Sequence, residues 1–193
     1  MREINYEDYF WQSGLIRLRG VQENDWESHY INRFDTPARL LLNYEVELPP
    51  TLKEAHQAND AFADFDLSQG RIMFTIETLE GDNVGGINLN SIDERNGTFS
   101  IGMQNDGLER GKGYGTSAIR ILMKYAFLER RLNKYYGSIL AGNTASASVL
   151  KKLGCKEEGV RRQMVYSNGI YHDEILYGLT KEEFMSIPEN LDC

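Results

Sequence analysis

The sequence is poor in residues that bind metals or form disulfides, with two cysteines and three histidines among 193 residues. Cys155 and Cys193 do not make a disulfide framework, and His29, His56 and His172 lack the spacing of a zinc site. No apolar run approaches the ~20 residues that a membrane-spanning helix needs, and no signal-peptide core opens the chain. We therefore expect a cytoplasmic protein without a metal or a membrane partner.

Positive charge is also scarce, because 21 Lys and Arg stand against 29 Asp and Glu for a net charge of −8. This balance argues against a nucleic-acid partner, which needs a basic surface. The charges are unevenly spread: residues 22–66 hold ten acids and three bases, whereas residues 109–152 hold nine bases and two acids. A basic centre beside an acidic leading segment suits an anionic cofactor and a cationic second substrate.

Hydrophobic periodicity predicts one mixed α/β domain over residues 1–193, with residues 1–14 and 185–193 peripheral. Asn24 or Asp25 is expected to cap a first helix, and Asp35-Thr-Pro37 to open a second. Alternating apolar residues predict strands at 15–21, 71–79, 84–92, 98–104, 134–141, 156–166 and 170–179. Further helices are predicted at 52–65, from the glycines near 113 to about 131, and at 143–153.

Three glycines at alternate positions open a strongly helical segment in Arg110-Gly-Lys-Gly-Tyr-Gly-Thr116. A bend with few side chains that feeds backbone N–H groups into a helix start is a site for phosphate. A P-loop fits poorly, because its lysine precedes Ser or Thr and Lys112 is followed by Gly113. A dinucleotide-binding fingerprint also fits poorly, since the spacing here is G-x-G-x-G and three strands come earlier.

Three motifs together resemble the GNAT superfamily of N-acetyltransferases. Arg110-x-x-Gly113-x-Gly115 is similar to its R/Q-x-x-G-x-G/A signature, and Asn143-Thr-Ala-Ser146 with the following helix to its N-x-x-S…K-x-G-F segment. Asn168-Gly-Ile-Tyr-His-Asp173 resembles the hairpin motif of the branch with ribosomal-protein N-terminal and spermidine acetyltransferases. The resemblance covers about residues 15–179. It implies an α+β fold, with a mostly antiparallel sheet of about six or seven strands, a central splayed parallel pair and about four or five flanking helices.

The resemblance also implies that acetyl-CoA lies between the two parallel strands, with its pyrophosphate on the glycine bend. Backbone N–H groups and the helix N-terminus would hold the phosphates, and a Cβ at Gly113 or Gly115 would push them away. Asn143 also suits the N-cap of the helix that follows it. The implied cofactor-binding residues are Met103, Gln104, Asn105, Arg110, Gly111, Lys112, Gly113, Tyr114, Gly115, Thr116, Asn143 and Ser146.

The proton donor to the leaving thiolate departs from the family pattern. Leu150 stands where many members carry a tyrosine, so the donor is Ser146, a nearby tyrosine or water. Cys155 stands where an aromatic residue is usual, and we interpret it as a small buried residue rather than a nucleophile. This interpretation disfavours an acyl-cysteine route.

The general base is not defined by a motif, because no acid lies in residues 98–104. Glu77, on an earlier predicted strand, is the first candidate, and Glu45 and Glu47 in the acidic segment are alternatives. Tyr171 matches the hairpin motif and is a third catalytic candidate beside Ser146 and Glu77.

These features predict an enzyme that transfers the acetyl group of acetyl-CoA directly to a neutral primary amine, without a metal. The acidic segment favours a cationic acceptor: a polyamine, an aminoglycoside-like amine or a basic protein N-terminus. The sequence leaves a homodimer open. Two rival interpretations are a non-catalytic CoA-binding module, suggested by Leu150 and the missing strand glutamate, and a protein that binds ATP on the glycine bend.

Overall fold

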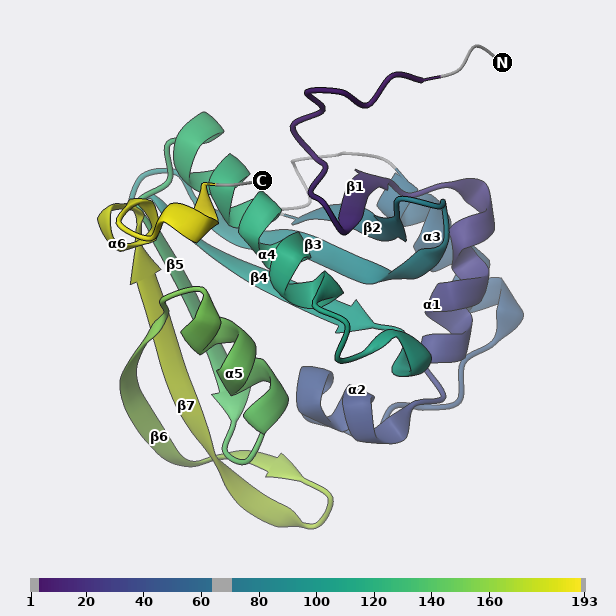
Figure 1. Ribbon diagram of the computed structural model, residues 1–193. Helices are drawn as coiled ribbons and strands as arrows, with labels where there is room; N and C mark the ends of the chain where they lie inside the picture. The colour runs from purple at the N-terminus through teal and green to yellow at the C-terminus, as the bar shows by residue number, and fades with distance from the viewer. Residues whose placement is uncertain (1–3, 64–70, 192–193) are drawn as a thin grey trace.

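Seven strands form one mixed sheet in the computed structural model, which describes residues 4–63 and 71–191. The strands are β1 (Ile16–Gly20), β2 (Arg71–Thr78), β3 (Asn83–Asp93), β4 (Thr98–Asn105), β5 (Lys134–Leu140), β6 (Lys156–Ser167) and β7 (Ile170–Thr180). Their order is β1-β2-β3-β4-β5-β7-β6, and all neighbours are antiparallel except β4 and β5 (Figure 1). The predicted sheet with one central parallel pair is confirmed.

Six α-helices flank the sheet within the described residues. They are α1 (Trp26–Asn32), α2 (Thr36–Asn43), α3 (Leu52–Ala63), α4 (Tyr114–Lys124), α5 (Thr144–Lys152) and α6 (Lys181–Met185). A π-helical turn, Tyr125–Glu129, continues α4 to nearly its predicted end. The helix α6 was not predicted, although Thr180 and Glu183 form the capping box that starts it. The predicted end of α3 at residue 65 lies outside the described residues.

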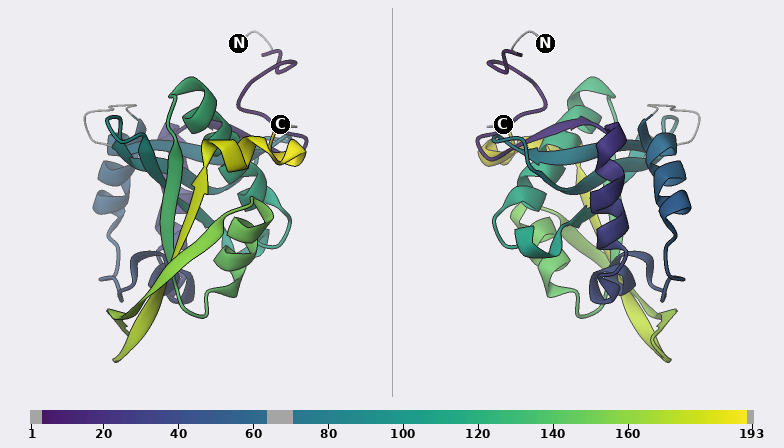
Figure 2. Two further views of the ribbon diagram at one scale, coloured as in Figure 1. Left: turned by 90° about the vertical axis from the view of Figure 1, so that its left-hand side faces the viewer. Right: turned by 90° about the vertical axis from the view of Figure 1, so that its right-hand side faces the viewer.

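The hydrophobic core lies between one face of the sheet and α4. Alternate residues of β2, β3 and β4 point into it, and α4 adds its apolar stripe. Ile76, Ile87, Phe99, Ile121 and Leu122 are all fully buried there. Figure 2 shows α3 on one side of the sheet and α5 on the other. The opposite face, toward α1, α2 and α3, carries polar residues and remains available for a binding site.

The parallel strands β4 and β5 separate soon after they begin. They pair only at Thr98 with Lys134 and at Phe99 with Tyr135. Beyond these pairs, β4 is bonded to β3 alone, so its other edge is open. The helix α2 lies near the ends of β4 and β5 (Figure 1), and the Tyr44 hydroxyl after it donates to the Ser138 carbonyl of β5 at 3.2 Å. The predicted splay is thus present.

Both ends of the chain contribute to the packing, although they were expected to be peripheral. Trp11 stacks on Phe74 of β2 with 4.9 Å between ring centroids. Asn190 is fully buried and donates to the carbonyls of Leu153 at 3.2 Å and Phe184 at 3.3 Å. Phe184 is itself fully buried, so the turn that follows it packs against the core.

Asp25 occupies the N-cap position of α1 but makes no capping hydrogen bond. Its carboxylate instead accepts from Arg19 at 2.7 and 2.9 Å, from Thr75 at 2.8 Å and from Asn83 at 2.8 Å. Burial raises the pKa of Asp25, but these bonds, Arg19 first, together with the Gln22 N–H lower the pKa to about 2. Asp25 therefore does not cap α1 itself, and its carboxylate instead accepts from the Gln22 N–H at 2.7 Å in the capping box of the 3-10 turn Glu23–Asp25 before α1.

Candidate active site

The glycine bend joins β4 to α4 and presents unpaired backbone donors. Gly111 has φ +80° and Gly113 has φ +92°, a left-handed conformation that residues with a Cβ rarely adopt. Gly113 is the N-cap residue of α4 and offers no capping side chain. Within the described residues, the N–H groups of 114–116 donate no hydrogen bond. Three donors at the positive end of the helix dipole are therefore free for an anion.

Gly115 lets the first turn of α4 lie close against β4. A Cβ on Gly115 would come within 2.7 Å of Met103 Cε and 3.1 Å of Asn105 Nδ2. The structure thus adds a packing reason for this glycine to the predicted phosphate clearance. It also places the bend directly beside the open edge of β4, where Met103, Gln104 and Asn105 lie.

The two basic side chains of the bend already have acidic partners. Arg110 Nη2 lies 2.5 Å from Asp35, and Lys112 Nζ lies 2.8 Å from Glu109. Asp35 also caps α2, because it accepts from the Ala38 N–H at 3.2 Å. Burial raises the pKa of Asp35, but the Arg110 and Ala38 hydrogen bonds outweigh it and lower the pKa. One carboxylate therefore ties the glycine bend to the start of α2.

The helix α5 begins with the predicted cap. Asn143 Oδ1 accepts from the Ser146 N–H at 3.1 Å, and the Asn143 side chain is buried. Ser146 is half-buried on the first turn, whereas Leu150, one turn on, belongs to the core. Burial raises the pKa of the Cys155 thiol to about 12, so it is protonated at neutral pH. This argues against an acyl-cysteine intermediate, as the sequence predicted.

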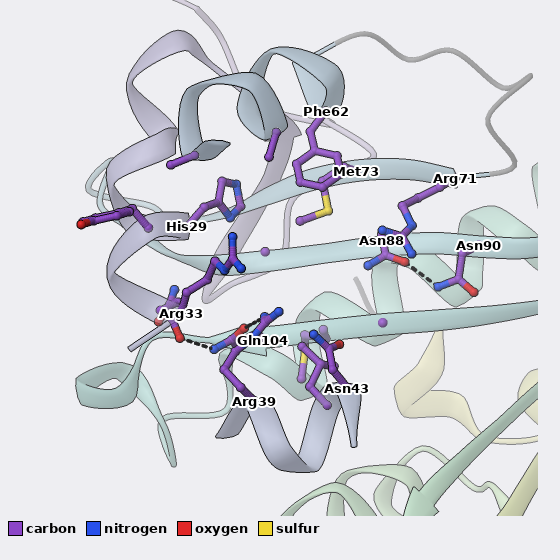
Figure 3. Close-up of a pocket in the computed structure, with 18 residues that line it drawn as sticks. His29, Arg33, Arg39, Asn43, Phe62, Arg71, Met73, Asn88, Asn90 and Gln104 are labelled. Carbon is purple, nitrogen blue, oxygen red and sulfur yellow. Dashed lines mark hydrogen bonds between the residues drawn. The ribbon is translucent and has the colours of Figure 1, made fainter. Parts of the chain in front are cut away.

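A cavity of about 430 Å³ opens on the face of the sheet opposite α4, beside the point where β4 leaves β5 (Figure 3). Its floor consists of alternate residues of three strands, among them Arg71, Met73, Asn88, Asn90, Gly102 and Gln104. Its walls come from α1, α2 and α3, including His29, Arg33, Arg39 and Phe62. Met103 also lines the cavity, so the cavity and the glycine bend meet at this residue.

The charges around the cavity are arranged in ion pairs. Arg39 binds Glu47 through Nη2 at 2.5 Å and Nε at 2.9 Å, and its Nη1 donates to Gln104 Oε1 at 2.7 Å. Arg33 Nη1 lies 2.9 Å from Glu54. The Arg39 hydrogen bond lowers the pKa of Glu47 below its ordinary value. No Asp or Glu is among the described residues that line the cavity itself.

Comparison with known proteins decides the family. The profile described as "Acetyltransferase (GNAT) domain" matches residues 16–156. The chain belongs to the GNAT acetyltransferase family. Its relative in Bacillus subtilis (strain 168), the SPbeta prophage-derived uncharacterized N-acetyltransferase YokL, is 34% identical over 178 residues, which cover 91% of this chain and 95% of YokL. The protein is therefore a GNAT N-acetyltransferase, and this family uses acetyl-CoA.

Solved structures share the GNAT fold with this chain. The spermidine N-acetyltransferase from Vibrio cholerae, in complex with CoA and spermine, has a TM-score of 0.77 at 17% identity over 88% of this chain and 98% of its own. The ribosomal L7/L12 α-N-protein acetyltransferase RimL, in complex with coenzyme A, has a TM-score of 0.74 at 20% identity over 87% and 95%. The resemblance to the ribosomal and spermidine branch is confirmed at the level of the fold.

His29 lines the cavity but was not among the site residues predicted from the sequence. Its side chain on α1 lines the cavity, and its Nε2 is buried without a hydrogen-bond partner among the described residues. Burial lowers the pKa of His29, although Asp25 and Asp106 oppose the shift. The imidazole is therefore neutral at pH 7. Arg39 and Arg71 were also missed, because isolated basic residues in the sequence form no motif.

The structure does not bring the three predicted catalytic residues together. The Glu77 carboxylate on β2 accepts from Arg17 at 2.9 Å and from Arg19 at 2.6 Å, and it lies outside the cavity lining. Tyr171, at the start of β7, is 65% exposed and packs on Tyr166 at the tip of the terminal hairpin. Three strands separate β2 from β7, and Ser146 lies on α5.

Within residues 4–63 and 71–191, no group of three or more His, Cys, Asp or Glu side chains could hold a metal ion. None of the helices in those ranges has the length and apolar character needed to cross a membrane.

Proposed function

We propose that this enzyme transfers the acetyl group of acetyl-CoA directly to a primary amine bound in the cavity. The observation that carries the proposal is the unpaired edge of β4, which has the glycine bend on one face and, at residues 102–104, the cavity on the other. Met103 lies beside Gly115 and also lines the cavity, so a ligand along the β4 edge would reach both sites.

The residues around this opening fit the phosphate and amide groups of acetyl-CoA. The free N–H groups from Gly111 to Thr116 would hold the pyrophosphate, with Arg110 and Lys112 adding charge once turned from their carboxylate partners. Backbone groups of Met103, Gln104 and Asn105, on the edge that β5 leaves open, would pair with the pantetheine arm. The buried Asn143 amide and Ser146 lie at the start of α5. The bound molecule supplies an activated acetyl thioester.

The remaining requirement is proton transfer, since an alkylamine is charged at neutral pH and attacks only when neutral. We assign proton acceptance to His29, because it is neutral, lines the cavity and has an unpartnered Nε2. Ser146 is the donor to the leaving thiolate in this proposal, since Leu150 has no proton to give. Glu77 and Tyr171 stay predictions from the sequence.

The acceptor is specified here only as a primary amine. The expectation of a cationic acceptor rests on the acid-rich leading segment. In the structure, Glu47, Glu54 and Asp35 from that segment are engaged by arginines. These carboxylates are therefore not free to attract a second cation.

Two measurements test the proposal. Thermal unfolding with acetyl-CoA or with ATP and magnesium tests the donor, and release of the CoA thiol with a panel of primary amines tests transfer. We expect stabilisation by acetyl-CoA alone, and thiol release that depends on the amine. Tight acetyl-CoA binding without release for any amine would favour the non-catalytic module. Stabilisation by ATP alone would contradict the assignment of the glycine bend.

A further inference from the structure

We propose that the acceptor amine also carries a carboxylate or a similar anionic group, which Arg71 and Asn88 bind on the cavity floor. This inference rests on the proposed amine acetylation at the same cavity, and it names the class of acceptor. The acceptor would then carry a negative group, whereas the acidic leading segment suggested a cationic acceptor.

Among the described residues, Arg71 is the cavity arginine for which no acidic partner is found. It begins β2, where it pairs with Asn90 of β3, and Met73 pairs with Asn88. Because alternate residues of paired strands share a face, Arg71, Asn88 and Asn90 all lie on the cavity side. Figure 3 shows the Arg71 side chain extending toward Asn88. No carboxylate in the described part of the chain forms an ion pair with Arg71, whereas Arg33 pairs with Glu47 and Glu54, and Arg39 pairs with Glu47.

Asn88 adds a second donor beside this guanidinium. Asn90 Nδ2 donates to Asn88 Oδ1 at 2.5 Å, and the Asn88 NH₂ group donates no hydrogen bond to a described residue. Gly102, opposite Asn88 on β4, makes room for that amide, since a Cβ there would lie 2.9 Å from Asn88 Nδ2. A guanidinium and an amide NH₂ together match the two oxygens of a carboxylate.

The rest of the lining also favours an anionic group over a cationic one. Arg33 and Arg39 lie on the wall, where Arg33 pairs with Glu47 at 3.6 Å and Glu54 at 2.9 Å, and Arg39 pairs with Glu47 at 2.5 Å. Among the described lining residues, no carboxylate is present to attract a cationic acceptor, and Arg71 is a cation without an ion-pair partner. The guanidinium of Arg71 would lower the pKa of an ammonium group bound nearby, which favours the neutral, nucleophilic amine. The cavity of about 430 Å³ suits an acceptor of small-molecule size.

Three matched series of acceptors test the proposal on the full chain. They are straight-chain ω-amino carboxylates of increasing length, the corresponding carboxamides, and diamines of the same lengths. At the best length, we expect kcat/KM for the carboxylate to exceed that for the carboxamide by about 10- to 100-fold, the range for a hydrogen bond to a charged group. The diamines are expected to be the poorest substrates. Equal rates, or a preference for diamines, would overturn the proposal.

Variants test which residues cause the preference for the carboxylate over the carboxamide. In Arg71→Gln, the ratio of carboxylate to carboxamide kcat/KM is expected to fall to about 1, and in Asn88→Ala to fall partway. Arg162→Gln is the matched control, because Arg162 is an exposed arginine on β6 at the other edge of the sheet. It should keep the wild-type ratio. A ratio that survives in Arg71→Gln would exclude Arg71 as the binding residue.

A binding measurement separates this inference from the proposed transfer reaction. If no series is acetylated, the CoA-saturated protein is titrated calorimetrically with the N-acetylated carboxylate and the N-acetylated carboxamide. Preferential binding of the carboxylate, lost in Arg71→Gln, would support the anion site while the transfer proposal fails. Equal binding of both compounds would overturn the anion site.

Discussion

Replacing Gly113 with alanine separates the conformation of the glycine bend from its binding role. The residue has φ +92° and ψ −9°, and an added Cβ would meet only Leu15 Cδ1, at an ordinary 3.5 Å. The cost is therefore one of backbone conformation, about 1–2 kcal/mol for an L-residue in the left-handed region. In a chain of this length each kcal/mol lowers Tm by roughly 2–4 °C, so Tm should fall by about 2–8 °C.

The same substitution should weaken binding of acetyl-CoA. Relief of the strain moves φ toward negative values and turns the free N–H groups of residues 114–116 away from the ligand. A hydrogen bond to a charged group is worth about 1.5–3 kcal/mol, so losing one raises the KM for acetyl-CoA about 10- to 100-fold. Steady-state kinetics and calorimetric titration with acetyl-CoA measure this change, and urea unfolding measures the loss of stability.

Gly81→Ala is the matched control for this prediction. Gly81 has φ +102° and no atom within 4 Å of an added Cβ, but it lies in the turn between β2 and β3. We expect a similar fall in Tm with an unchanged KM for acetyl-CoA. If Gly113→Ala loses stability but keeps its KM within twofold, the bend is not the phosphate site. If it loses no stability, the reasoning from strain is refuted.

Three further predictions concern charged and titratable groups. Asp25→Asn should lower the free energy of unfolding at pH 7 by about 2 kcal/mol, since the pKa is lowered from 3.8 to about 2 in the folded protein. That contribution is present above pH 3.8 and lost as the pH falls through about 2, which urea titrations at several pH values check. Glu77→Gln breaks two buried ion pairs and should cost about 3 kcal/mol of stability; a kcat that also fell more than tenfold would favour its predicted role as the base. His29→Asn should lower kcat about 100-fold. NMR titration of wild-type His29 should place its pKa below 6.5, and a value above that would count against His29 as a neutral acceptor.

Much of the fold could be predicted because its signals are local. Asp35 caps α2 and Pro37 stands in its first turn, as their order in the sequence indicates. Asn143 caps α5 in the same way. The capping box of Thr180 and Glu183 is equally local, although no helix was predicted after the last strand.

The partners of charged residues could not be predicted, because they are distant in the chain. Arg19 meets Glu77 across 58 residues, and Arg110 meets Asp35 across 75. The composition therefore shows that residues 22–66 are rich in acids, but it does not show that arginines neutralise several of them. His29 could not be predicted for the same reason, because the burial of its Nε2 depends on the strands packed against α1.

The sequence by itself determined the family, the order of the strands and helices and the position of the glycine bend, since these follow from short motifs and periodicity. Only the tertiary structure decided which side chains share the cavity. Strand pairing places Arg71 opposite Asn90 and on the same face as Asn88, and packing of α1, α2 and α3 over that face adds two more arginines and a neutral histidine. The charge that an acceptor meets is a sum over residues brought together by folding, and the net charge of a segment does not predict it.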